Sequence, residues 1–170
     1  MRRLALLLAI GLTIAAAACK RGAKHVVSAP DLLSVLPVDD PHAAAQLVRG
    51  FHSLEGNPWR WTAGKFSVIL RPPPEAALDG AKLELKLNIP DVVISKLGAV
   101  TLSATAAGSP LAPEKYTEPG NHVYTRDVPA SALAGDSVNI EFATDKAMPP
   151  GATEKRELAL IVTSIGLVSK

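Results

Sequence analysis

Alternating apolar and polar residues mark several short strands in this chain. The clearest run is residues 82–89, where four apolar side chains alternate with four polar ones, which predicts a strand with one buried and one wet face. The same period of two appears over residues 65–71, 100–106 and 138–142. No stretch after the N-terminal segment shows the periodicity of a helix long enough to form a core.

Turn-forming residues separate these runs. The chain holds 14 prolines and 12 glycines, and residues 122–128 and 156–167 add two more strand-like stretches between such breaks. Residues 129–135 read as one helical turn that connects two strands. Seven or eight strands with short connections predict an all-β fold, an antiparallel β-sandwich. A jelly-roll arrangement is the first expectation for its topology, and a barrel is the second.

The first nineteen residues follow a different pattern. Arg2 and Arg3 precede an uncharged apolar run over residues 4–18, which ends in alanines directly before Cys19, the only cysteine of the chain. A basic start, a short apolar segment and small residues are typical of a secretory signal, and the run is shorter than the ~20 residues of a transmembrane helix. The segment resembles a bacterial lipoprotein signal that ends in a lipobox, although Ala16 stands where leucine is usual.

The resemblance implies that the chain is cut before Cys19, whose thiol carries a diacylglyceryl group and whose new amine takes a further acyl chain such as palmitate. Each buried methylene contributes ~0.8 kcal/mol, so several chains give durable membrane attachment. The alternative is an ordinary signal cut after Ala18, which would leave Cys19 as a free thiol. Lys20 follows the cysteine in place of an aspartate, which favours the outer membrane, on its periplasmic or surface face, over the inner membrane.

The predicted organisation is a signal peptide over residues 1–18, a lipidated cysteine and tether over residues 19–46, and a β-sandwich over residues 47–170. Within the tether, Asp40-Pro41 before three alanines predicts a short capped helix. The whole chain has 18 Lys+Arg and 16 Asp+Glu, and the signal holds two of the bases, so the remainder balances at 16 and 16. A domain without net charge creates no overall positive electrostatic potential that would attract phosphate groups, which argues against a nucleic-acid partner.

Trp59 and Trp61 are the most distinctive candidates for binding. Two residues apart on a strand, they share one face and Arg60 takes the other. On an exposed face the indole rings form a platform for sugar rings, whereas on a buried face they are core. We expect Trp61 in the core and Trp59, which follows the loop signature Asn57-Pro58, at the surface. The candidate ligand contacts are aromatic or cationic residues: Trp59, Arg60, Tyr116 and Tyr124.

Residues 51–56 and 59–62, together with residues 156–158 near the end of the chain, resemble a small β-sandwich module of uncharacterised envelope proteins that is similar to carbohydrate-binding modules. The similarity covers about residues 50–167. The resemblance implies core positions, turns and an ion pair at Phe51, Leu54, Glu55, Gly56, Trp61, Gly64 and Arg156. Phe51, Leu54 and Trp61 would be core, and the glycines would form turns. Glu55 would pair with either Arg60 or Arg156.

No catalytic signature stands out in the sequence. The 4 histidines are scattered without metal-ligand spacing, and no nucleophile elbow or phosphate-binding loop is present. We therefore predict no catalytic residue, metal or cofactor. The sequence favours a lipid-anchored envelope protein whose non-catalytic sandwich binds a glycan or another envelope component. The alternative is a structural lipoprotein that acts as a protein–protein adaptor in an envelope complex.

Overall fold

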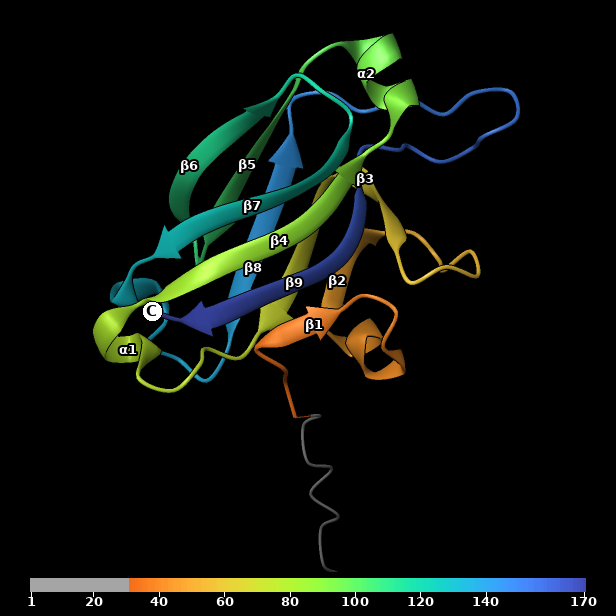
Figure 1. The fold of residues 1–170 in the computed structure, drawn as a ribbon. Coiled ribbons are helices and arrows are strands. Elements are labelled where there is room, and N and C mark those ends of the chain that lie inside the picture. The colour runs from red at the N-terminus through yellow and green to blue at the C-terminus, as the bar shows by residue number, and fades with distance from the viewer. Residues whose placement is uncertain (1–30) are drawn as a thin grey trace, which may run out of the picture.

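Antiparallel strands dominate residues 31–170, the part of the chain that the structure, a computed structural model, describes (Figure 1). The predicted signal and the predicted lipidation site Cys19 lie outside these residues. The elements are, in chain order, β1 (Val35–Pro37), the 3-10 helix η1 (Pro41–Ala45), β2 (Leu47–Phe51), β3 (Arg60–Leu70), α1 (Ala76–Asp79), β4 (Ala81–Ile89), α2 (Asp91–Leu97), β5 (Val100–Ala106), β6 (Ser109–Tyr116), β7 (Gly120–Val128), η2 (Ala130–Ala132), β8 (Val138–Thr144) and β9 (Ile161–Ser169).

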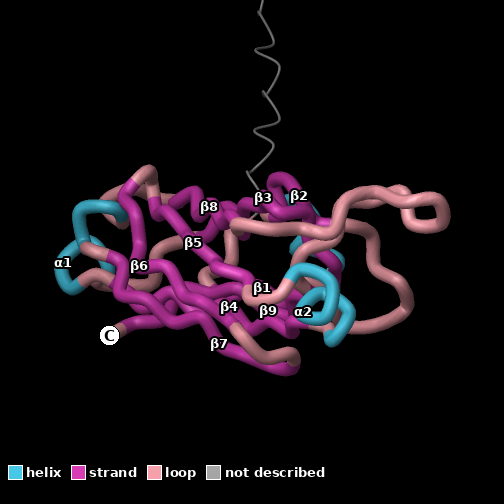
Figure 2. The backbone as a smooth tube through the Cα atoms, turned by 90° about the horizontal axis from the view of Figure 1, so that it is seen from above, coloured by secondary structure: helices cyan, strands magenta, loops and turns pink. Residues whose placement is uncertain are grey.

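The strand pairs are nested. The hairpin of β5 with β6 lies inside the pair of β4 with β7, which lies inside β3 with β8, and β1 with β9 is the outermost pair. This nesting defines two sheets, β1-β9-β4-β7 (the β9 sheet) and β2-β3-β8-β5-β6 (the β8 sheet). Figure 2 shows β2, β3 and β8 in one layer and β4, β7 and β9 in the other. The predicted antiparallel β-sandwich with jelly-roll topology is confirmed.

The first residues of β3 join the two sheets. Arg60 and Trp61 pair with β9, whereas residues 65–70 of the same strand pair with β8. The sandwich is therefore one continuous sheet that folds over itself, with β6 and β7 at its two ends.

The alternation in the sequence predicts the buried faces well. In β4, Leu83, Leu85 and Leu87 are buried while Lys82 and Lys86 are exposed. The bounds of β5 agree with the prediction, and β4 and β8 differ from it by one or two residues at an end. The closing strand, however, begins at Ile161 and not at Arg156, because the residues before it form a bridge from Leu158 to Met148 and a turn of their own.

Aromatic rings fill the centre of the sandwich. Phe66 stacks on Phe142 at 4.8 Å between ring centroids, and Phe51 meets Phe66 edge-on at 5.4 Å. Tyr124, which comes from the β9 sheet, reaches Phe142 of the β8 sheet at 6.5 Å in a T-shaped contact. These rings are the largest apolar groups removed from water between the sheets.

The ordered domain begins earlier than the sequence predicts. Leu36 of β1 and the following Val38 are fully buried, and β1 extends the β9 sheet through its pairing with β9. Gln46 holds this segment in place: its amide bonds both backbone groups of Leu33 and the carbonyl of Ile69, at 2.8 to 3.1 Å. The predicted tether over residues 19–46 is therefore too long, because its last part forms a strand, a helix and core contacts.

The short helix predicted after Asp40 is confirmed as η1. The Asp40 carboxylate accepts a hydrogen bond from the backbone nitrogen of His42 at 2.8 Å, and Pro41 occupies the first turn. The helix ends at Ala45, since Gln46 turns inward to make the contacts described above.

The edge strands β6 and β7 face each other without a ladder of backbone hydrogen bonds, and side chains close this seam between them. The Tyr124 hydroxyl donates to the carbonyl oxygen of Ala112 at 2.8 Å, and Arg126 donates to the same oxygen at 2.6 Å. Arg126 also reaches the carbonyl of Pro113 at 3.0 Å and the carboxylate of Glu114 at 2.9 Å. The edge of β6, where backbone acceptors would otherwise be open, is thus satisfied by two side chains of β7.

The seam yields a prediction about two buried tyrosines. Replacing Tyr124 with Phe removes the bond to Ala112 and should lower the unfolding free energy by about 1 kcal/mol. Tyr116→Phe removes a buried hydroxyl that has no partner in residues 31–170, so stability should be unchanged or higher. Urea unfolding followed by tryptophan fluorescence compares the two. A loss at Tyr116→Phe equal to that at Tyr124→Phe would contradict this account.

Candidate functional site

Two crossovers meet at one end of the sandwich. Leu70, the last residue of β3, pairs with Val138, the first residue of β8, and Ala81 at the start of β4 pairs with Val128 at the end of β7. The loop over residues 71–80 and the loop over residues 129–137 therefore span the same gap between the same two strand pairs. Because they must run side by side, α1 of the first loop packs near η2 of the second.

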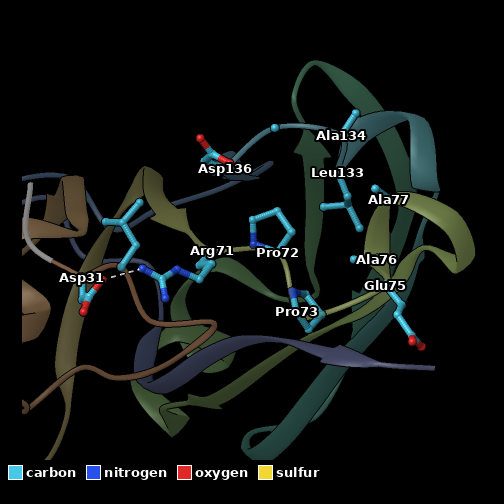
Figure 3. Close-up of a pocket in the computed structure, with 12 residues that line it drawn as sticks. Asp31, Arg71, Pro72, Pro73, Glu75, Ala76, Ala77, Leu133, Ala134 and Asp136 are labelled. Carbon is cyan, nitrogen blue, oxygen red and sulfur yellow. Dashed lines mark hydrogen bonds and ion pairs between the residues drawn. The ribbon is translucent and has the colours of Figure 1, made fainter.

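A groove of about 580 Å³ lies between these loops, and we name it the α1–η2 groove (Figure 3). Pro73, Ala76 and Leu133 are buried among its lining residues, and Pro72 and Ala134 continue the apolar wall. The remaining lining residues are Asp31, Leu32, Arg71, Glu75, Ala77, Gly135 and Asp136. An apolar floor with a few polar groups at the rim is the usual composition of a small-ligand site.

The rim of the groove carries three carboxylates and one guanidinium. Arg71 pairs with Asp31 at 2.7 Å, whereas Glu75 and Asp136 form no ion pair within residues 31–170. Glu75 also has a φ of 65°, in the left-handed region that costs a non-glycine residue roughly 1–2 kcal/mol. Strained residues of this kind concentrate at functional sites.

Two of the predicted ligand contacts lie outside this groove, beside β3. Trp59 is half-buried directly before the strand and is not among the residues that line the groove. Arg60 makes structural bonds: its Nε donates to the carbonyl of Val38 at 2.7 Å and its Nη1 to that of His52 at 3.0 Å. The guanidinium thus links β3 to the segments before and after β2.

The two tyrosines predicted as ligand contacts lie in the core. Tyr124 has no exposed surface and Tyr116 has 4%. Burial raises the pKa of both phenols above the usual value, with Arg126 acting in the opposite direction. Neither ring presents a surface to an external ligand, so the assignment of these residues as ligand contacts is corrected.

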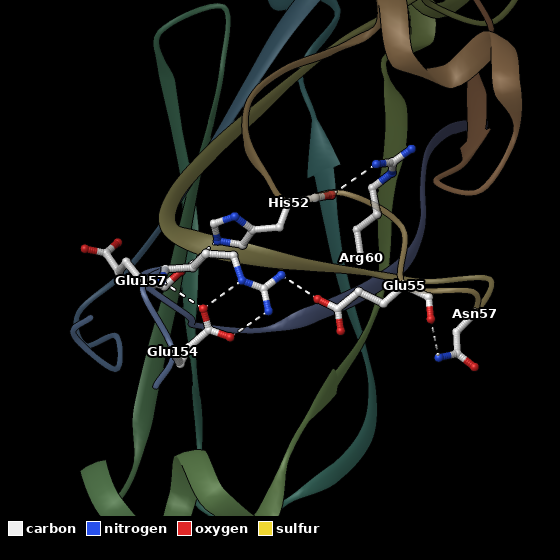
Figure 4. Close-up of polar contacts among 7 residues, drawn as sticks. His52, Glu55, Asn57, Arg60, Glu154 and Glu157 are labelled. Atoms are coloured by element: carbon white, nitrogen blue, oxygen red, sulfur yellow. Dashed lines mark hydrogen bonds and ion pairs between the residues drawn. The ribbon is translucent and has the colours of Figure 1, made fainter. Parts of the chain in front are cut away.

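An ion-pair cluster joins the loop after β2 to the segment before β9 (Figure 4). The Arg156 guanidinium pairs with Glu55 on one side and with both carboxylate oxygens of Glu154 on the other, at 2.7 and 2.8 Å. These bonds lower the pKa of Glu154 to about 2. The predicted pair between Glu55 and Arg156 is confirmed, and the alternative partner Arg60 is bound elsewhere.

Among the other positions implied by the sandwich resemblance, the structure confirms three and corrects two. Phe51 and Trp61 pack against the core while remaining partly exposed, and Gly56 lies in a turn with a φ of 78°. Leu54 is 39% exposed and is not core, because its loop extends away from the sheets to meet Arg156. Gly64 lies within β3 and not in a turn.

Gly64 is required for a close approach. Its nitrogen donates to Oε1 of Glu157 at 2.6 Å, and a β-carbon there would lie 3.0 Å from that oxygen. His52 bonds the backbone carbonyl of Glu157 at 2.8 Å. The charged groups of this cluster are thus engaged by one another and by the backbone, so we assign the cluster a structural role.

Two further findings concern residues 31–170 only. No three His, Cys, Asp or Glu side chains gather there in a way that can hold a metal ion. Among the helices of that part of the chain, none combines the length and the apolar character needed to cross a membrane.

The sequence matches no protein-family model and no curated protein. Among solved structures, it is similar to the CBM51-2 and INT domains from Clostridium perfringens ZmpB, with 11% identity, and to the same domains in complex with GlcNAc, with 12% identity. The TM-score is 0.37 in both cases, over 79% of this chain. The match covers 28% of those chains, so this chain spans about a quarter of their length. The fold assignment therefore rests on the strand pairings described above.

Sequence reasoning did not identify the groove. Its two walls lie about 60 residues apart in the chain, and the prolines at residues 72–74 indicate by themselves only the end of a strand. The segment 129–135 was correctly predicted as a helical turn between strands, and η2 occupies it. The missing information was which strands pair, since the pairing alone brings the two loops together.

The lowered pKa of Glu154 predicts a pH-dependent stability. A carboxyl whose folded pKa lies below its unfolded value stabilises the fold above pH 4.5 and loses that contribution as the pH falls through 2. Glu154→Gln should therefore lower the melting temperature at pH 7, and the difference from the wild type should shrink between pH 4.5 and 2. Glu118→Gln, at an exposed carboxylate without an ion pair in residues 31–170, is the control and should show no such trend. An equal difference at pH 7 and pH 2 would refute the role of this ion pair.

Proposed function

We propose that this protein is an exported lipoprotein, held at a membrane through Cys19, and that its sandwich binds a glycan of the cell envelope in the α1–η2 groove without catalysing a reaction. The observation that carries the proposal is the groove itself. Its volume of about 580 Å³ lies within the ~300–1,000 Å³ of typical small-ligand sites. It is formed by loops at the ends of strands, which is where sandwiches place binding residues.

The lining of the groove suits a sugar in two respects. Pro72, Ala77 and Ala134 offer aliphatic surface for the C–H face of a pyranose ring. Around that surface, the carboxylates of Glu75 and Asp136 accept hydrogen bonds from hydroxyl groups. Because neither carboxylate is engaged in an ion pair within residues 31–170, a ligand need not break one to bind there.

The surface favours a glycan over a flat protein partner. The exposed large apolar side chains of residues 31–170 are spread over different elements, one each: Val35, Val48, Leu54, Leu78, Val92 and Val123. A contiguous exposed apolar patch is one common mark of a protein-docking face. The groove, by contrast, concentrates apolar surface in a concave site.

The position of the groove agrees with attachment at the N-terminal side. Asp31, the first described residue, lines the groove, and it lies twelve positions after the cysteine at position 19. At ~3.3–3.6 Å per residue, that length reaches at most ~40 Å. Under the proposed anchor, the groove stays within this distance of the bilayer, on the periplasmic or surface face of the outer membrane. Its ligand would accordingly be a glycan close to the membrane.

The anchor is tested at the cysteine. Wild-type protein from cells fed with labelled palmitate should carry the label, fractionate with membranes and have the intact mass of a chain that begins at acylated Cys19. Cys19→Ser should lose the label and leave the membrane fraction, because the thiol is the acceptor of the lipid. A wild-type chain that begins at Lys20, or an unlabelled one, would refute the anchor.

The groove is tested by filling it. Ala134→Trp places a large side chain in the groove and should weaken binding to an envelope polysaccharide at least tenfold on a glycan array probed with the full chain in detergent. Ala152→Trp, at an exposed loop residue outside the lining of the α1–η2 groove, is the matched control and should bind like the wild type. Trp59→Ala should also bind normally, since Trp59 lies outside the groove.

Two results would exclude this site. One is the absence of binding to every envelope polysaccharide on the array. The other is an equal loss at Ala134→Trp and Ala152→Trp, which would show that the tryptophan acts without regard to its position.

A further inference from the structure

A β-bulge interrupts the pairing of β4 with β9. The register passes from Lys86 opposite Ser164 to Leu87 opposite Val162, so Thr163 is the extra residue on β9. Two of its hydrogen-bonding groups have partners: the hydroxyl donates to the Lys86 carbonyl at 3.3 Å, and the Thr163 carbonyl accepts from the Val38 nitrogen at 3.0 Å. Bulges bend a strand and redirect its side chains, and they are frequent next to binding sites.

A hollow of about 360 Å³ lies at this bulge, and we name it the bulge hollow. Lys86, Val123 and Thr163 line it from three neighbouring strands, and Lys86 is directly opposite Val123 in the β4–β7 register. Asn121, His122 and Leu87 complete the lining. Val123 is 52% exposed, so an apolar side chain and an ammonium group lie side by side at an open surface.

The polar lining of the bulge hollow contains no carboxylate. Lys86 makes no ion pair within residues 31–170, and the nearest acid on the same face of β4, Glu84, lies outside the lining. The Oδ1 atom of Asn121 already accepts a hydrogen bond from Asn88 at 2.8 Å, which leaves its Nδ2 atom as a donor. The site therefore offers donors and a positive charge, and it complements an anion with several acceptor oxygens.

We infer that the bulge hollow is a second binding site, which takes a uronic acid residue of an acidic glycan. Its carboxylate pairs with the Lys86 ammonium and accepts from the Asn121 amide, and its ring packs on Val123. A carboxylate alone would use only the polar half of the hollow, and a neutral sugar would leave the ammonium without a partner. The juxtaposition of Lys86 and Val123 thus selects a ligand with both features.

The bulge hollow is independent of the α1–η2 groove. No residue lines both, and along β4 the five steps from Ala81, which follows the first loop of the groove, to Lys86 span roughly 17 Å at ~3.3 Å per residue. The charges also differ, since acids line the groove and a lysine lines the hollow. The failure of one site would leave the other unaffected.

The experiment titrates the ¹⁵N-labelled full chain in detergent micelles with D-galacturonate, D-galactose and acetate. Galacturonate should shift the amide signals of Asn121, Val123 and Thr163 in a saturable way, and galactose and acetate should bind at least fivefold more weakly. Lys86→Gln should weaken galacturonate binding at least fivefold. Lys82→Gln is the matched control, because Lys82 is an exposed lysine on the same face of β4 that does not line the hollow, and this variant should bind like the wild type.

Each alternative outcome overturns the inference. Equal binding of galactose and galacturonate would show that the carboxylate is not recognised, and equal binding of acetate would show that the ring is not. An equal loss at Lys86→Gln and Lys82→Gln would assign the effect to overall charge. Shifts confined to the α1–η2 groove would place the acidic sugar in the other site. Melting temperatures of both variants confirm that the comparison concerns folded protein.

Discussion

The packing of two apolar sheet faces against each other is the constraint on which this structure depends. Phe66 and Phe142 stack within the β8 sheet, and Tyr124 reaches them from the β9 sheet. The same tyrosine then bonds the carbonyl of Ala112 in β6, so one side chain both fills the core and closes the seam. Once the faces are packed, the nested pairing fixes where every crossover lies. The groove between α1 and η2 follows from that pairing, because two loops must bridge the same strand pairs at one end.

The sequence predicts well whatever depends on a short pattern. In β4 the period-two alternation identified the buried leucines and the exposed lysines, and Asp40-Pro41 identified the capped helix η1. Long-range features were less accessible. A strand as short as β1, which ends in Pro37, has too few residues to show a period, and its burial depends on pairing with a strand more than 120 residues later. The tether was therefore predicted to be too long.

Candidate site residues were harder to predict for the same reason. Residue type suggested that aromatic side chains bind a ligand. Tyr116 and Tyr124, however, lie on the inner faces of β6 and β7 and are buried in the core. Arg60 is taken by two backbone carbonyls that come from distant segments. The residues that line the groove and the hollow include prolines, alanines and a lysine, whose types alone indicate nothing about function. The function that such residues can serve depends on which other residues the strand pairing places beside them.

The two concave sites also show how one strand serves different purposes at its two ends. Near Ala81, β4 emerges from α1, and the loop that precedes it is held by the left-handed Glu75 and by Gly80, where a β-carbon would lie 2.5 Å from the carbonyl of Val128. Near Lys86, the same strand is bent by an extra residue in its neighbour, β9. Regular pairing between these points buries Leu83 and Leu85 and keeps the frame rigid. The two departures from regular geometry in and before β4 thus lie next to the two concave surfaces, one before Ala81 and one opposite Lys86.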